Sequence, residues 1–118
     1  PNTVHVSAHS NETGKQTTQT SAISVPSTEG FHTYGMLWTE EEIVWYFDDV
    51  AIASAETPSD MHDPMYLLVN LAVGGAAGKP GDLSGGAKMV IDYIHAYEID
   101  DDAAPTSSIS SASDDGLV

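Results

Sequence analysis

The sequence predicts an all-β protein, an antiparallel β-sandwich, on three observations. Apolar and polar residues alternate with a period of two in several segments, as they do in half-buried strands. Aromatic and β-branched residues, which favour strands, gather in the same segments. Turn-forming residues separate the segments at short intervals, a spacing typical of sandwiches.

The first predicted strand, residues 4–9, shows the alternation most clearly. Its small apolar side chains share one face and its polar side chains share the other: Val4, Val6 and Ala8 against His5, Ser7 and His9. Residues 11–14 carry turn chemistry, and a Thr-rich second strand is predicted over 17–25. The first strand should therefore bury one face and present hydrogen-bonding groups on the other.

An aromatic-rich pair of strands is predicted next, over residues 31–39 and 43–48, around the acidic turn 40–42. A helix through this region is disfavoured, because its apolar residues are consecutive and lack helical spacing. Trp38 and Trp45 are expected in the core. Further strands are predicted at 50–55, 65–73 and 88–99, with a glycine-rich loop over 74–86.

Composition narrows the class of partner. The 118 residues hold 18 acidic residues, three lysines and no arginine, for a formal charge of -15. Nucleic acid is disfavoured, since its binding relies on Lys and Arg, whereas a neutral partner such as a sugar is compatible with this surface. Cysteine is absent, which excludes disulfides and thiolate metal sites. No apolar run approaches the roughly 18 residues that span a bilayer.

Two parts of the chain differ in their capacity to fold. Residues 1–99 hold enough apolar side chains for a core, whereas residues 100–118 are acidic and Ser-rich and are predicted to be a linker or disordered tail. The chain begins at Pro1, without Met or a signal peptide, and is expected to be an internal piece of a longer protein.

Two motifs carry a resemblance to a known family. The first runs from Phe31 to Asp48 (FHTYGMLWTEEEIVWYFD) and the second from Met65 to Gly75 (MYLLVNLAVGG). Together they resemble the second half of the catalytic domain of glycoside hydrolase family 16, the laminarinase, lichenase and bacterial exopolysaccharide endoglycanase group. The resemblance covers about residues 1–99 and implies part of a concanavalin A-like jelly roll and a secreted bacterial enzyme.

A retaining glycosidase needs two carboxyl groups about 5–5.5 Å apart. The resemblance implies a Glu-x-Asp-x-x-Glu motif for this purpose, and the sequence has only the partial match 98–103, which lacks the last glutamate. The chain is therefore expected to be the C-terminal part of a retaining endo-β-glycanase, inactive alone, with its catalytic carboxylates upstream of Pro1. The alternative is a lectin-like or self-assembling β-sandwich module, paired with a missing N-terminal half or with a second copy.

The resemblance implies that His5, Ser7, His9 and Asn70 bind the polysaccharide substrate, a β-glucan or bacterial exopolysaccharide. Imidazole and hydroxyl groups donate and accept hydrogen bonds, which suits sugar hydroxyls. Two simpler interpretations stay open: the first-strand residues face only solvent, and Asn70 is a core amide satisfied by backbone groups.

A structural Ca²⁺ is also implied, with Asp92 as one ligand. Since calcium takes six to eight oxygen ligands, one carboxylate is an incomplete site. A zinc site at His5 and His9 would require the strand to bend and is disfavoured.

Overall fold

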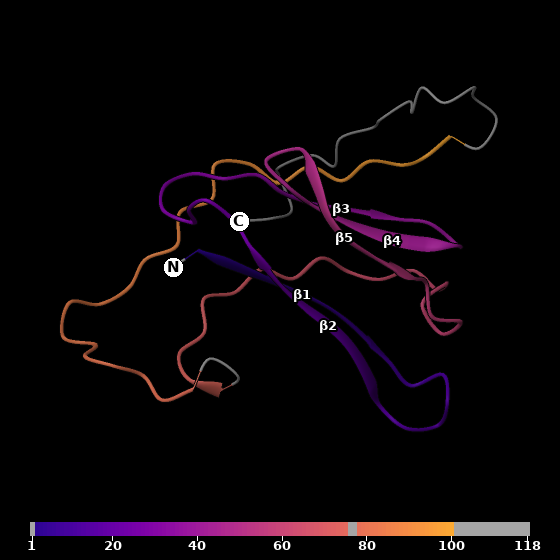
Figure 1. The fold of residues 1–118 in the computed structure, drawn as a ribbon, viewed down its shortest axis with the longest axis horizontal. Coiled ribbons are helices and arrows are strands. Elements are labelled where there is room, and N and C mark those ends of the chain that lie inside the picture. The colour runs from indigo at the N-terminus through magenta and orange to yellow at the C-terminus, as the bar shows by residue number, and fades with distance from the viewer. Residues whose placement is uncertain (1, 76–77, 101–118) are drawn as a thin grey trace. The chain divides into compact units, whose positions relative to one another are not determined.

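The computed structural model describes residues 2–75 and 78–100, and the strands of these residues lie in the first half of the chain (Figure 1). Their bounds are Thr3–Ser10 (β1), Thr17–Ser24 (β2), Tyr34–Trp38 (β3), Glu42–Phe47 (β4) and Val50–Glu56 (β5). The chain divides into two compact units, Pro1–Tyr66 and Leu67–Val118. The antiparallel all-β class is confirmed, as are the first five predicted strands to within a few residues.

β1 and β2 form an antiparallel hairpin. The pairing places Ser7 opposite Thr20 and His9 opposite Thr18. The connecting turn is closed by the Gly14 amide, which donates to the Asn11 carbonyl at 2.9 Å. The predicted alternation in β1 is confirmed, because every second side chain, from Val4 to Ser10, is buried.

β3, β4 and β5 form an antiparallel three-stranded meander. Thr39 organises the acidic turn between β3 and β4, since its Oγ1 accepts the Glu42 amide at 3.0 Å and donates to the Glu42 carbonyl at 3.0 Å. Asp48 and Asp49 form the two-residue turn between β4 and β5, with φ angles of 49° and 64°. Positive φ at both central residues is the type I′ geometry that matches the twist of a hairpin.

The core of the first unit joins its two sheets. Val4 and Val6 of β1 pack with Val25 and with Phe47 of β4. Three partly buried side chains complete the cluster: Trp45, Ile52 and Ala53. Ile43, at 1% exposure, is the most deeply buried large side chain of the described residues. Trp38 and Trp45 are half-buried, so their expected place in the core is confirmed only in part.

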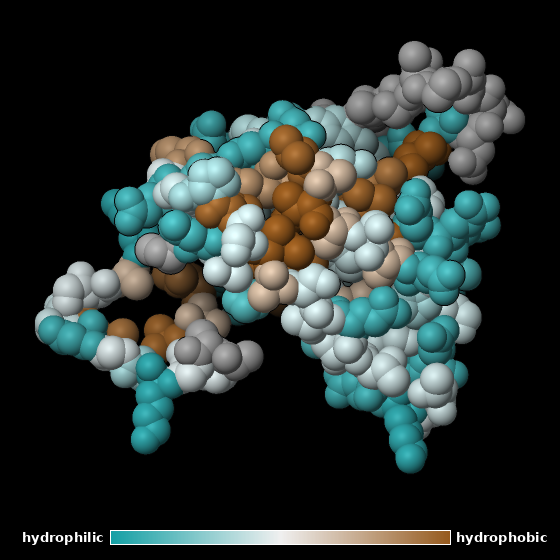
Figure 2. Space-filling model, viewed as in Figure 1, coloured by the Kyte–Doolittle hydropathy of each residue, from teal (hydrophilic) through white to brown (hydrophobic). Residues whose placement is uncertain are grey.

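The segments 65–73 and 88–99 differ from the prediction. Both were predicted to be strands, and neither forms one in the structure. A strand is held by hydrogen bonds to a partner backbone, and no ladder forms in the described part of Leu67–Val118. The apolar side chains of these segments stay exposed, Tyr66 at 84% and Leu68 at 71%. Figure 2 shows, in brown, that hydrophobic residues reach the surface on the face it presents.

The predicted tail lies almost wholly outside the described residues, which end at Asp100. In the described part of the chain no helix is long and apolar enough to cross a membrane.

Candidate site on the outer face of the first hairpin

The predicted substrate-binding residues of β1 lie in one row. His5, Ser7 and His9 are all exposed, and they alternate with buried residues of the same strand. Side chains two residues apart on a strand point to the same face, with a spacing of about 7 Å. The structure therefore brings these three residues together on one polar surface of the hairpin. His5, Ser7 and His9 form the polar row of β1.

β2 extends this row with two hydroxyl groups. Ser7 Oγ lies 2.9 Å from Thr20 Oγ1, and His9 Nδ1 lies 2.9 Å from Thr18 Oγ1. Both contacts follow from the cross-strand register, in which these residues are directly opposed. Thr18 and Thr20 were not predicted as site residues, because the strand predicted over 17–25 contains both but its pattern does not fix the cross-strand register.

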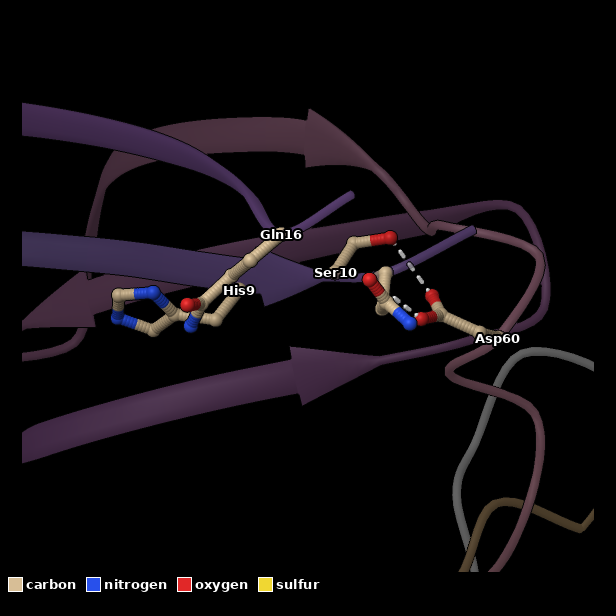
Figure 3. Close-up of a pocket in the computed structure, with 5 residues that line it drawn as sticks. His9, Ser10, Gln16 and Asp60 are labelled. Carbon is tan, nitrogen blue, oxygen red and sulfur yellow. Dashed lines mark hydrogen bonds between the residues drawn. The ribbon is translucent and has the colours of Figure 1, made fainter. Parts of the chain in front are cut away.

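A carboxylate from a distant loop lies at the end of β1 (Figure 3). Asp60 accepts a hydrogen bond from Ser10 Oγ at 2.7 Å and another from the Asn11 amide at 2.6 Å. These two donors lower the pKa of Asp60, the Asn11 amide most strongly, because both stabilise the ionised carboxylate. The sequence carries no signal for this contact, since about fifty residues separate the partners.

A shallow, open depression of 410 Å³ surrounds this carboxylate, lined by His9, Ser10, Asn11, Gln16 and Asp60. Its side chains do not converge on one point, because the His9 ring points away from Asp60 in Figure 3. The depression is therefore the margin of the polar row and not a closed binding pocket.

His32 has a structural role in the first unit, where both of its ring nitrogens face an oxygen acceptor. Its Nδ1 lies 2.8 Å from Asp48 Oδ2, and its Nε2 lies 2.9 Å from the Glu29 carbonyl. The Asp48 hydrogen bond raises the pKa of His32. The Thr33 amide and then His32 lower the pKa of Asp48. With acceptors facing both ring nitrogens, the geometry favours the doubly protonated imidazolium.

Asn70 belongs to the second unit, where it is exposed and lies outside any strand. Its predicted place on a cleft face depended on a period-two strand, which the structure does not form. Its role as a substrate contact stays a prediction.

Comparison with protein families shows the family to which the chain belongs. The family described as glycosyl hydrolases family 16 matches residues 1–95. The chain belongs to this family. The matched residues include all five strands and the polar row of β1.

Two similar relatives come from Rhizobium meliloti (strain 1021). The chain is 68% identical over 103 residues to the endo-1,3-1,4-beta-glycanase EglC, and 66% identical over 102 residues to the endo-1,3-1,4-beta-glycanase ExsH. Each alignment covers 86% of this chain and 22% of the relative, so the chain spans less than a quarter of their length. A beta-glucanase of Rhodothermus marinus is 33% identical over 112 residues, covering 80% of this chain and 38% of that protein. No solved structure matches the chain.

The predicted calcium ligand lies in the second unit. Asp92 is exposed in the second unit. No group of three or more His, Asp or Glu side chains suited to a metal occurs among residues 2–75 and 78–100. Because calcium needs six to eight oxygens, the described residues do not fit a calcium ion by themselves, and Asp92 as a ligand stays a prediction.

Proposed function

We propose that this chain is part of a retaining endo-β-glycanase that hydrolyses O-glycosidic bonds of β-glucans or a bacterial exopolysaccharide. Membership in family 16 supports a glycan-hydrolysing role, and the names of the Rhizobium relatives suggest mixed-linkage β-glucan as substrate. In this proposal the catalytic glutamates lie in a part of the domain outside this chain, and the protein acts outside the cell.

The observation that carries the proposal is the polar row on β1. His5, Ser7 and His9 are exposed on the face opposite the buried apolar row, so they are available to a ligand. Hydroxyl and imidazole groups offer the mixed donors and acceptors that match the hydroxyls of a sugar chain. Thr18 and Thr20 hold two of these side chains in place. The row would then supply part of one wall of the cleft, and Asn70 stays a separate predicted contact.

The charge of the chain agrees with a neutral glycan. With 18 acidic residues and three lysines, the surface has little to offer a polyanion. A neutral polysaccharide is not repelled by this surface, and its hydroxyls can bind to carboxylates as well as to imidazoles.

The proposal makes two claims, and two measurements on the purified chain separate them. Incubation with lichenan or laminarin should release no reducing ends above buffer, because the sequence has no Glu-x-Asp-x-x-Glu motif. Release of reducing ends would contradict the placement of the catalytic carboxylates outside the chain. Binding without hydrolysis is expected from a cleft wall, and a lectin-like module would give the same result.

The second measurement tests the polar row itself. Isothermal titration with mixed-linkage β-glucan oligosaccharides should show that the double variant His5→Ala/His9→Ala binds at least about tenfold more weakly than the unchanged chain. His95→Ala is the matched control, because His95 lies in the second unit among Tyr93 and Tyr97. Equal affinity of the double variant and the unchanged chain would exclude the row as the sugar contact.

A further inference from the structure

Two carboxylates connect the end of β1 to the loop after β5. One belongs to the loop and accepts hydrogen bonds from the end of β1, and the other follows β1 and accepts hydrogen bonds from the loop. Asp60 reaches back to Ser10 and Asn11. Glu12 reaches forward to Ser59, whose amide and hydroxyl donate to Glu12 Oε2 at 2.8 and 2.9 Å. These five residues, 10–12 and 59–60, are called the carboxylate clasp below.

The clasp depends on hydrogen bonds and not on ion pairs. Among the described residues, neither Asp60 nor Glu12 forms a salt bridge with a lysine or histidine. Each carboxylate instead accepts two hydrogen bonds from hydroxyl or backbone N–H donors. Such charge-assisted bonds are shorter and stronger than neutral ones and fix the direction of the donor.

Ser10 makes the clasp more than a surface contact. It is the only buried polar residue of the described chain, at 5% exposure, and it ends the inward row of β1. Its hydroxyl donates to Asp60 and accepts the Glu12 amide at 3.1 Å. A buried hydroxyl that loses its partner keeps its desolvation cost, so removing Asp60 should displace Ser10 from its inward position.

His9 precedes Ser10 and faces outward, so any displacement of Ser10 reaches the polar row through the backbone. The ring of His9 is not in contact with Asp60, from which it points away in Figure 3. Its partner is Thr18 Oγ1 at 2.9 Å, a bond that requires the correct register at this end of the hairpin.

We infer that Asp60 is a positioning residue for the polar row. Through Ser10 and Asn11, Asp60 holds His9 in the orientation that faces the ligand. This inference rests on the proposed function, because it assumes that His9 contacts the glycan. It extends that function by assigning a role to the loop after β5, which has no predicted site residue.

Asp60→Ala is the principal test, with Asp63→Ala as the matched control. Asp63 is an exposed aspartate of the same loop, and no hydrogen bond of the described residues involves its side chain. In nitrogen-proton NMR spectra of the histidine rings, Asp60→Ala should shift the His9 signals and leave those of His95 unchanged. Its affinity for mixed-linkage β-glucan oligosaccharides should fall by about tenfold.

Conservative variants distinguish positioning from a general loss of stability. Asp60→Glu keeps a carboxylate and should recover most of the affinity and the His9 signals. Asp60→Asn keeps an acceptor for only one of the two donors and should give an intermediate effect; it also replaces Asp60→Ala if that variant does not fold. Unmoved His9 signals in folded Asp60→Ala or Asp60→Asn would overturn the inference, whatever the affinity.

The two proposals fail in different ways. If the unchanged chain binds no β-glucan oligosaccharide, the proposed function fails, while the His9 signals still report whether Asp60 positions the ring. If the unchanged chain binds and Asp60→Ala binds equally well with unmoved His9 signals, the positioning role fails and the proposed function stands.

Discussion

The two halves of the chain use similar residues with different results. Residues 3–56 form five strands, with the row Val4, Val6 and Ala8 buried. Segments 65–73 and 88–99 are at least as apolar, yet they form no strand and expose their side chains. The difference teaches that a suitable pattern is not sufficient for a strand, because each strand also needs a partner with free backbone groups.

The partners of the first half are its neighbours in sequence. β1 pairs with β2, and β3, β4 and β5 pair in order, each through a short turn. The first unit thus satisfies its own ladders, whereas in the described residues the second unit has none. Measurements of exchange and stability in the two units test this contrast.

Hydrogen exchange should show the largest contrast. Ladder amides of the first unit open only by sub-global unfolding, so β4 amides should exchange about a thousandfold or more slowly than amides of 65–73 and 88–99. Exchange followed by NMR measures both classes in one sample. Protection of alternate amides over 65–73 would indicate a ladder there and would break the contrast.

Shortening an apolar side chain should lower stability much more in the first half of the chain than in the second. Ile43→Ala removes the most buried large side chain and should lower the free energy of unfolding by about 2–5 kcal/mol. Leu68→Ala is the control, because that side chain is 71% exposed and should change stability by at most about 0.5 kcal/mol. Urea denaturation followed by tryptophan fluorescence measures both; equal losses would contradict the contrast in burial.

The His32–Asp48 pair should give the first unit a pH-dependent stability. The pKa of His32 is raised above 6.5, so its contribution is complete below that pH and is lost as pH rises through the raised value. The pKa of Asp48 is lowered below 3.8, so its contribution is complete above that pH and is lost as pH falls through the lowered value. The pair is therefore fully effective between 3.8 and 6.5.

His32→Gln should reveal this window. The stability difference between the unchanged chain and the variant, from urea midpoints, should be largest near about pH 5 and should shrink above neutral pH. His62→Gln is the control, because His62 faces a backbone carbonyl, that of Glu40 at 3.2 Å, in place of a carboxylate. A His32→Gln difference that is constant with pH would exclude the charged pair.

The smallest effect is expected at the turn between β4 and β5. Asp49 has a φ of 64°, a conformation that glycine adopts without strain, and Asp-Gly is a preferred type I′ pair. Asp49→Gly should stabilise the first unit by about 0.5–1 kcal/mol in thermal or urea unfolding, because relief of a left-handed strain of about 1–2 kcal/mol exceeds the entropic cost of glycine. Asp63→Gly is the control and should not stabilise the first unit, because Asp63 has no positive φ. A lower stability of Asp49→Gly would show that the Asp49 side chain contributes more to stability than the backbone strain costs.

Much of the first unit was predictable from the sequence, because local pattern and local pairing coincide there. The alternation in residues 4–9 placed His5, Ser7 and His9 on one face, and the structure has them there. The helix alternative failed because Thr39 closes the acidic turn. Residues 65–73 were predicted wrongly because period-two reasoning cannot show whether a partner strand is available.

The side-chain contacts between distant segments of the first unit were not predictable from the sequence. Asp60 looks like an ordinary loop residue, since its partners are 49 and 50 residues away in sequence. His32 and Asp48 likewise meet only because the loop before β3 lies beside the β4–β5 turn. Such pairs depend on the tertiary arrangement, which cannot be predicted from the pattern of a single sequence.

The pairing of strands that are neighbours in sequence has a consequence for the rate at which the first unit forms. Both sheets close through short loops, so each hairpin can form on the microsecond timescale without a search for distant segments. The bonds of the carboxylate clasp span about fifty residues and should form late. Ser10 would then be the last residue of β1 to reach its native environment, and substitutions at Asp60 should speed unfolding and leave the folding rate nearly unchanged.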